Sequence, residues 1–179
     1  RSMRQAVQVA HADVRENILS LRTTLANEKG LVSAIHEYLN EFTIQTQIKT
    51  TFINHTEGAL GLSSMAEVQL VCILQEALAN VRKHAQAALV EVRIGQHVGQ
   101  KSGSEQGEYI LMEVADNGIG FSHNGTQRSF GLQTMHERAL SVNGELDIRS
   151  TAGEGTSVIC RLPCLQEENL HKQTHYGSS

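Results

Sequence analysis

The sequence of 179 residues contains no tryptophan, a single proline and only 4% aromatic residues. Its three cysteines are too few and too scattered for a disulfide framework or a zinc site, so we expect free thiols in a reducing compartment. No apolar run is long enough to span a membrane, and no signal peptide is present. A formal net charge of −4 gives no basic surface for nucleic acid.

The composition is that of an ordinary globular protein, with 40% hydrophobic and 19% charged residues. This length is enough for one domain with a hydrophobic core and a short appendage. We divide the chain into an arm at residues 1–29, a domain at 30–165 and a polar tail at 166–179.

The arm is predicted to be helical, with apolar residues spaced by threes and fours. These residues are Met3, Val7, Ala10, Val14, Ile18, Leu21 and Leu25. The spacing is that of a coiled-coil seam, with one extra step of four between Val14 and Ile18. Gly30 is a suitable C-terminal cap for this helix.

The domain is predicted to alternate helices and strands. We expect helices from residue 31 to about 42, after the loop 58–64, and from Gly131; strands at 48–53, 88–98, 109–115, 145–150 and 157–162; and a Gly/Ser-rich hairpin turn at 99–107.

The helix after the loop at 58–64 carries a polar stripe opposite an apolar one. At 3.6 residues per turn the polar stripe comprises Glu76, Asn80, Lys83 and His84, and the apolar stripe comprises Leu70, Leu74, Leu78, Val81 and Ala85. A carboxylate, an amide and two potential cations can order an attacking group, bind a hard cation and contact phosphate. A solvated face is the alternative, but asparagine is a poor residue for a helix interior, so Asn80 favours a functional stripe.

A strand-like run ends at Asp116, whose carboxylate can accept a hydrogen bond from an exocyclic amine. Gly118 and Gly120 allow the backbone to turn and to approach a flat ring closely. The alternative is an ordinary Asp-Asn-Gly turn of a hairpin. The run is too long for a tight hairpin, however, and no second strand follows it directly.

The polar residues between Gly118 and Phe130 are typical of a lid over a ligand. Gly131 then opens a helix, whose first backbone N–H groups can face phosphate, and Leu132 begins its apolar face. Further along, Gly153-Glu154-Gly155-Thr156 is either a simple hairpin loop or a turn that brings Thr156 beside a base.

In this order and spacing, the motifs resemble the ATP-binding catalytic domain of bacterial sensor histidine kinases. That domain belongs to a superfamily shared with gyrase, the mismatch-repair ATPases and the ninety-kilodalton heat-shock chaperone. Residues 76–85 resemble the N box, and 116–120, Gly131 and 153–156 resemble three glycine boxes. The sequence is most similar to the nitrate-sensor-like subfamily, through Glu-Ala-Leu-x-Asn-x-x-Lys-His-Ala and Gly-Leu-x-x-Met-x-Glu-Arg-Ala.

The resemblance, which covers about residues 5–163, implies an α/β two-layer sandwich, the Bergerat ATP-binding fold, with a mixed, largely antiparallel sheet and helices on one face. It implies binding of ATP and Mg²⁺, with Asn80 as the metal ligand and Glu76 as the catalytic residue that orients or deprotonates an acceptor imidazole. It assigns the nucleotide site to Asn80, Lys83, His84, Asp116, Gly118, Gly120, Phe130, Gly131, Leu132, Gly153, Gly155 and Thr156.

The resemblance also implies transfer of the γ-phosphate to a histidine, relay to a response regulator with a receiver domain, and a homodimeric full-length protein. The domain is expected to be cytoplasmic, whether or not the full-length protein has a membrane anchor. Residues 1–29 resemble the second helix of the dimerisation and phosphotransfer hairpin, and His11 lacks the acidic neighbour of the acceptor, so we expect the acceptor helix to be missing from these residues. An anti-sigma-type serine kinase and a non-catalytic nucleotide-sensing or dimerisation module are the alternatives.

Overall fold

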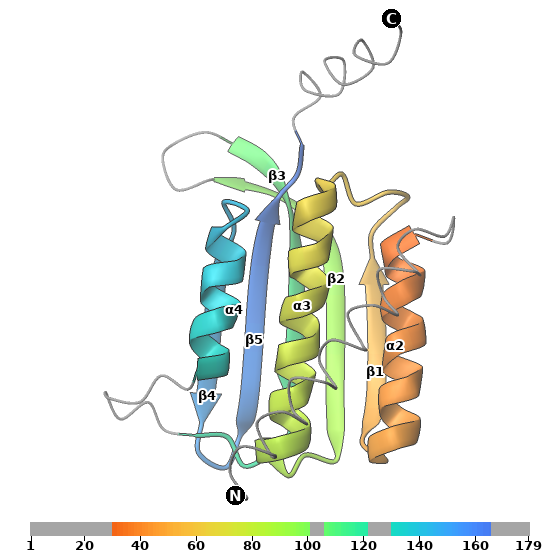
Figure 1. Ribbon diagram of the computed structural model, residues 1–179, viewed down its shortest axis with the longest axis vertical. Coiled ribbons are helices and arrows are strands. Elements are labelled where there is room, and N and C mark those ends of the chain that lie inside the picture. Colours follow the sequence, from red (N-terminus) through yellow and green to blue (C-terminus); the bar gives the residue numbers. More distant parts are fainter. Residues whose placement is uncertain (1–29, 101–105, 122–129, 166–179) are drawn as a thin grey trace, which may run out of the picture.

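The computed structural model describes residues 30–100, 106–121 and 130–165 (Figure 1). The predicted coiled-coil arm, most of the predicted lid and the polar tail lie outside these residues.

A five-stranded mixed sheet forms one layer of the molecule (Figure 1). Its strands are β1 (Lys49–His55), β2 (Leu89–Gln100), β3 (Gln106–Asp116), β4 (Glu145–Thr151) and β5 (Gly155–Pro163), in the order β1-β2-β3-β5-β4. The β1–β2 pair is parallel and the other pairs are antiparallel. The predicted mixed, largely antiparallel sheet is therefore confirmed.

Three helices cover one face of this sheet: α2 (Gly30–Thr46), α3 (Ser64–Asn80) and α4 (Phe130–Leu140) (Figure 1). Alternate strand residues point toward them, and in β3 these are the buried Ile110, Met112 and Val114. The predicted apolar stripe of α3 supplies the other side of the core, with Leu70, Leu74 and Leu78 at most 1% exposed. The predicted two-layer α/β sandwich is confirmed.

The face of the sheet away from the helices carries a cluster of charged and polar groups and is covered by no described helix. There Arg93 of β2 forms ion pairs with Glu91 on its own strand and with Glu113 on β3. Ser157 of β5 donates a hydrogen bond to the same Glu113 carboxylate, at 2.7 Å. A ligand pocket enclosed by apolar groups therefore has to lie on the helical side.

Helix α3 begins at a capped turn, since the Ser63 hydroxyl accepts a hydrogen bond from the backbone N–H of Ala66. Its end differs from the prediction. After Asn80 the chain continues as a π-helical turn, η1 (Val81–Ala85), which ends at Gln86 with φ of 51°. A π turn contains more residues than an α turn, so each residue rotates by less than the α-helical step.

Several element boundaries also differ from the prediction. Helix α2 extends to Thr46, and the turn between β2 and β3 is shorter than the predicted 99–107. Backbone pairing continues through Gly99 with Gly107 and through Gln100 with Gln106. Glycine lacks a side chain to favour a strand, but it does not prevent ladder hydrogen bonds, so the sequence pattern underestimated these strands.

Candidate functional site

A cavity of about 510 Å³ lies between the helical layer and the sheet, at the end of the sheet where β3 terminates and β5 begins. Its apolar walls come from α3, η1, α4 and the facing strands, and include Ala77, Val81, Ala85, Val114, Leu132 and Val158. Four polar side chains face it among these apolar groups: Asn80, His84, Asp116 and Thr156. A concave, mostly apolar site with few polar groups is typical of small-molecule recognition.

Asp116 is the carboxylate in this wall. Its Oδ1 accepts a hydrogen bond from the backbone N–H of Gly118 at 2.8 Å, and the carboxylate also accepts one from the backbone of Thr156. Burial raises the pKa of Asp116, and these two backbone hydrogen bonds only partly offset the rise. The group is a half-desolvated acceptor, held in place by the main chain and able to receive an amine hydrogen.

Glycine is required beside Asp116 because the backbone segments touch one another. A Cβ atom at Gly118 would collide with the carbonyl oxygen of Ala85, and one at Gly155 with that of Asp116. Gly120 has φ of 55°, and a Cβ there would collide with the carbonyl oxygen of Thr151. The loop after β3 therefore packs directly on η1 and on the β4–β5 turn.

Asn80 lies at the junction of α3 and η1, in the cavity wall. Its Nδ2 atom is buried and has no hydrogen-bond partner. A buried polar atom of this kind normally has a partner, so its lack of one indicates a group that a ligand would satisfy.

The start of α4 packs against the polar stripe of α3. A Cβ atom on Gly131 would collide with Oε1 of Glu76 and would lie 3.6 Å from Nδ2 of Asn80. Glu76 and Gly131 are thus adjacent to the cavity, and the first turn of α4 lies next to Asn80.

The predicted site residues separate into three groups. The cavity wall contains Asn80, His84, Asp116, Gly120, Leu132 and Thr156. Gly118 and Gly155 lie against the backbone of two wall residues, Ala85 and Asp116. Glu76 and Gly131 flank it. Lys83, Phe130 and Gly153 are not among the lining residues. Lys83 is exposed and Phe130 is 83% exposed, while the backbone N–H of Gly153 donates to the carbonyl of the cavity-lining Ile119 at 2.7 Å.

The π-helical turn explains the separation of Lys83 from His84. Regular α-helical rotation would put both on the stripe of Glu76 and Asn80, as predicted. The smaller rotation per residue in η1 moves Lys83 away and leaves His84, four residues after Asn80, over the cavity.

Sequence reasoning missed several residues of the site. Ile119 and Phe121 line the cavity, and the Oδ1 atom of Asn117 accepts hydrogen bonds from the backbone of Ala88 and Leu89 at 3.0 and 2.9 Å. Ser150 lies directly opposite Thr156 in the β4–β5 hairpin. Counting residues outward from the predicted glycine turn would have identified this last pair.

A divalent cation would have few protein ligands here. Within the described residues no group of three or more histidine, cysteine or acidic side chains could hold a metal ion. Mg²⁺ is usually bound by one or two protein groups together with substrate phosphates and waters. The side-chain oxygen of Asn80 could serve as one such ligand, while its unpartnered Nδ2 could donate to a phosphate oxygen.

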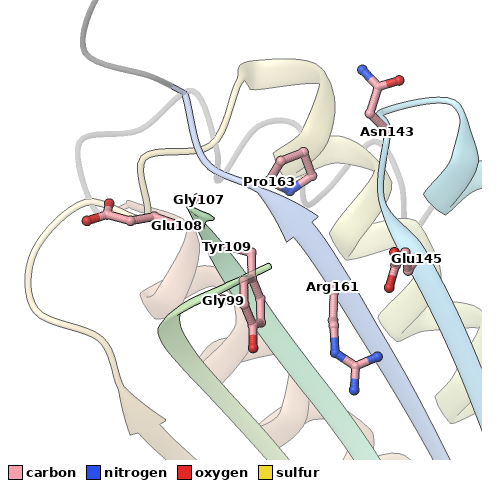
Figure 2. Close-up of a pocket in the computed structure, with 8 residues that line it drawn as sticks. All are labelled: Gly99, Gly107, Glu108, Tyr109, Asn143, Glu145, Arg161 and Pro163. Carbon is pink, nitrogen blue, oxygen red and sulfur yellow. The ribbon is translucent and has the colours of Figure 1, made fainter. Parts of the chain in front are cut away.

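A second cavity, of about 170 Å³, lies at the opposite end of the sheet (Figure 2). Tyr109 and Arg161 contribute side chains from β3 and β5, with Glu108, Glu145 and Pro163 nearby. Tyr109 and Arg161 alternate with the buried Ile110 and Leu162, so they belong to the face without helices.

Comparison with known proteins identifies the family. A family model described as "Histidine kinase-, DNA gyrase B-, and HSP90-like ATPase" matches residues 65–166, which include both walls of the larger cavity. The chain belongs to this family, and the resemblance found in its motifs is confirmed.

Curated relatives and solved structures agree with this assignment. The chain is 33% identical over 169 residues to the signal transduction histidine-protein kinase/phosphatase DegS of Brevibacillus brevis, covering 94% of the chain and 41% of the relative. It is 31% identical over 154 residues to the oxygen sensor histidine kinase NreB of Staphylococcus carnosus, covering 84% of the chain and again 41% of the relative. The chain thus spans about two fifths of the length of these relatives.

The fold is shared with the histidine kinase domain of the blue-light activated histidine kinase from Erythrobacter litoralis, with a TM-score of 0.63 at 17% identity. The match covers 88% of this chain and 75% of that domain. None of the described helices is long and apolar enough to cross a bilayer.

Proposed function

We propose that this chain is the ATP-binding catalytic domain of a two-component sensor histidine kinase, with the domain at residues 30–165, the arm at 1–29 and the tail at 166–179. The observation that carries the proposal is the cavity in which the half-desolvated Asp116 carboxylate and the unpartnered Asn80 amide face the same space. The family match and the kinase names of the relatives support it.

The Asp116 end of the cavity binds adenine in this proposal. The carboxylate accepts a hydrogen bond from the exocyclic amine, Thr156 supports the ring edge, and Gly118, Gly120, Gly153 and Gly155 shape the backbone around it. Guanine presents a carbonyl where adenine presents the amine, so GTP would place two acceptors face to face, at a cost of about 1–3 kcal/mol or more. ATP should therefore bind much more tightly than GTP.

The Asn80 end binds the phosphates and Mg²⁺. The Asn80 oxygen coordinates the metal and its nitrogen donates to a phosphate oxygen, which satisfies the buried atom. His84 offsets phosphate charge at the cavity, and Lys83 adds positive charge from the exposed side of η1. The first turn of α4, with Phe130, Gly131 and Leu132, presents backbone N–H groups. When bound, Mg²⁺ neutralises phosphate charge.

Glu76 orients or deprotonates the imidazole of the acceptor histidine, which must be neutral at the attacked nitrogen. The imidazole nitrogen then attacks the γ-phosphorus, the bond from this phosphorus to the β,γ-bridging oxygen breaks, and ADP leaves. The phosphoryl group later passes to a response regulator with a receiver domain. We place the acceptor histidine on a hairpin helix other than residues 1–29. We expect this domain to be cytoplasmic and the full-length protein to be a homodimer.

Incubation with γ-labelled ATP and a supplied hairpin that carries an acceptor histidine tests this function. We expect an acid-labile, alkali-stable phosphate on the hairpin and none on His11. Glu76→Gln should retain ATP binding but lose transfer. A phosphoserine product would instead indicate an anti-sigma-type serine kinase, and ATP binding without any transfer would indicate a nucleotide-sensing module.

A further inference from the structure

We propose that Ser150 is a positioning residue for base recognition, acting through the hydroxyl of Thr156. This inference rests on the proposed function, since it takes adenine as the base. Ser150 is not one of the cavity-lining residues, so its effect has to be indirect.

The geometry places three polar side chains in one row across three neighbouring strands. Asp116 of β3 pairs with Thr156 of β5, and Thr156 pairs with Ser150 of β4. The Ser150 and Thr156 hydroxyl oxygens are 3.0 Å apart, and the Thr156 backbone donates to the Asp116 carboxylate. The row begins at the acceptor for the base amine and ends at Ser150.

The hydrogens of this row limit what Thr156 can offer to a ligand. Ser150 Oγ accepts from the backbone N–H of Phe121 at 2.8 Å, and its single hydrogen can go to Gly155 O at 3.1 Å or to Thr156 Oγ1 at 3.0 Å. When the Ser150 hydroxyl donates to Thr156 Oγ1, the Thr156 hydroxyl is free to donate its own hydrogen to a ligand. Adenine presents a ring nitrogen acceptor, N1, beside its amine, and Thr156 in this state is its complement.

The same hydroxyl also joins two walls of the cavity. Phe121 belongs to the loop after β3, and Thr156 belongs to β5; both line the cavity. Through Ser150 the loop backbone and the β5 hydroxyl are held relative to one another. Replacing Ser150 by a residue without a hydroxyl removes both contacts but leaves Asp116 and its two backbone donors unchanged.

Calorimetric titration of Ser150→Ala and Ser150→Cys with ATP tests the proposal. We expect the dissociation constant for ATP to rise about fivefold to tenfold, the value of roughly one hydrogen bond. The matched control is Ser157→Ala, on the neighbouring strand, whose hydroxyl contacts Glu113 on the opposite face of the sheet. This control should bind ATP as the wild type does.

A base analogue separates positioning from general weakening of the fold. 1-Deazaadenosine triphosphate keeps the amine but replaces N1 by C–H. Ser150→Ala should therefore weaken binding of this analogue clearly less than binding of ATP, because only the contact with the Phe121 backbone is then lost. A double-mutant cycle with Thr156→Val should show that the two losses are not additive, because both remove the same contact.

Equal losses for ATP and the 1-deaza analogue, additive losses in the cycle, or unchanged ATP binding in both Ser150 variants would overturn the inference. Failure of the wild-type chain to bind ATP would instead overturn the proposed function. The two failures are therefore distinguishable.

Discussion

The two cavities described above lie at opposite ends of the same sheet and differ in how their polar groups are held. The larger one, of about 510 Å³, is covered by the helical layer, and its Asp116 has a pKa raised by burial. The smaller one, of about 170 Å³, has more charged groups, Glu108, Glu145 and Arg161, but lies on the face that no described helix covers.

Unpartnered buried atoms make the difference clearer. Among the described residues, Gln75 Nε2 and Asn80 Nδ2 are the buried side-chain nitrogen or oxygen atoms without a partner, and only Asn80 belongs to a cavity wall. A group that has lost water without gaining a protein partner gains most when a ligand arrives. Matched substitutions in the two cavities can test this comparison.

The largest effect is expected for Asp116→Ala. Loss of a hydrogen bond to a charged acceptor, about 1.5–3 kcal/mol, should raise the dissociation constant for ATP by roughly 10- to 150-fold. Glu145→Ala, a carboxylate removed from the smaller cavity, should leave it unchanged. Calorimetry on both variants measures this, and comparable losses would show that the two cavities are not functionally distinct.

Asn80→Ala should have the next largest effect, and only when metal is present. We expect Mg-ATP affinity to fall about tenfold, with a clearly smaller loss for ATP in excess chelator, because the metal ligand and one phosphate donor are removed together.

The control for Asn80 is Asn143→Gly in the smaller cavity. Asn143 has φ of 57°, a conformation that glycine tolerates better than alanine does. Equal losses for Asn80→Ala with and without metal would remove the metal role of Asn80.

A smaller effect is expected from pH. Because burial raises the pKa of Asp116, this carboxylate takes up a proton in the folded state at a higher pH than in the unfolded chain. Folding stability without ligand should therefore rise, relative to Asp116→Asn, as pH falls through that raised pKa. ATP affinity should fall severalfold over the same range, because the protonated group no longer accepts from the amine. Thermal melts and ATP titrations from pH 7 to 4 measure the two quantities. A fall in both folding stability and ATP affinity, or a rise in both, would contradict this prediction.

The sequence predicted those parts of the fold and site that depend on local pattern. The apolar stripe of α3 and the strand ending at Asp116 follow from residue spacing. Glycine at 118 and 120 was predicted to allow approach to a flat ring, whereas in the structure the closest neighbours of these positions are the backbone carbonyls of Ala85 and Thr151. The π-helical turn could not be predicted, because no residue type in Val81–Ala85 requires it. This turn separates Lys83 from His84.

Residues that act through contacts with a neighbouring strand were also missed. Ser150 matters because β4 lies beside β5, and Asn117 because its side chain caps the start of β2. Neither residue has a local signal strong enough to indicate a function. The Ser150–Thr156 register follows from the hairpin turn, but the pairing alone does not indicate a function. The contacts of Asn117 with Ala88 and Leu89 are tertiary information.

The smallest effect is expected for Arg161→Gln, which removes the cation of the smaller cavity. Arg161 lies on the sheet face without helices, at the far end of β5 from Thr156, and its neighbours are Tyr109 and Glu145 (Figure 2). Half-exposed charges on such a face contribute little, so we expect ATP affinity to change by less than about twofold and stability by less than about 1 kcal/mol. Calorimetry with ATP and a urea unfolding curve measure the two quantities. A large loss of ATP affinity with unchanged stability would mean that the two ends of the sheet are energetically coupled, and the contrast between the cavities would then have to be abandoned.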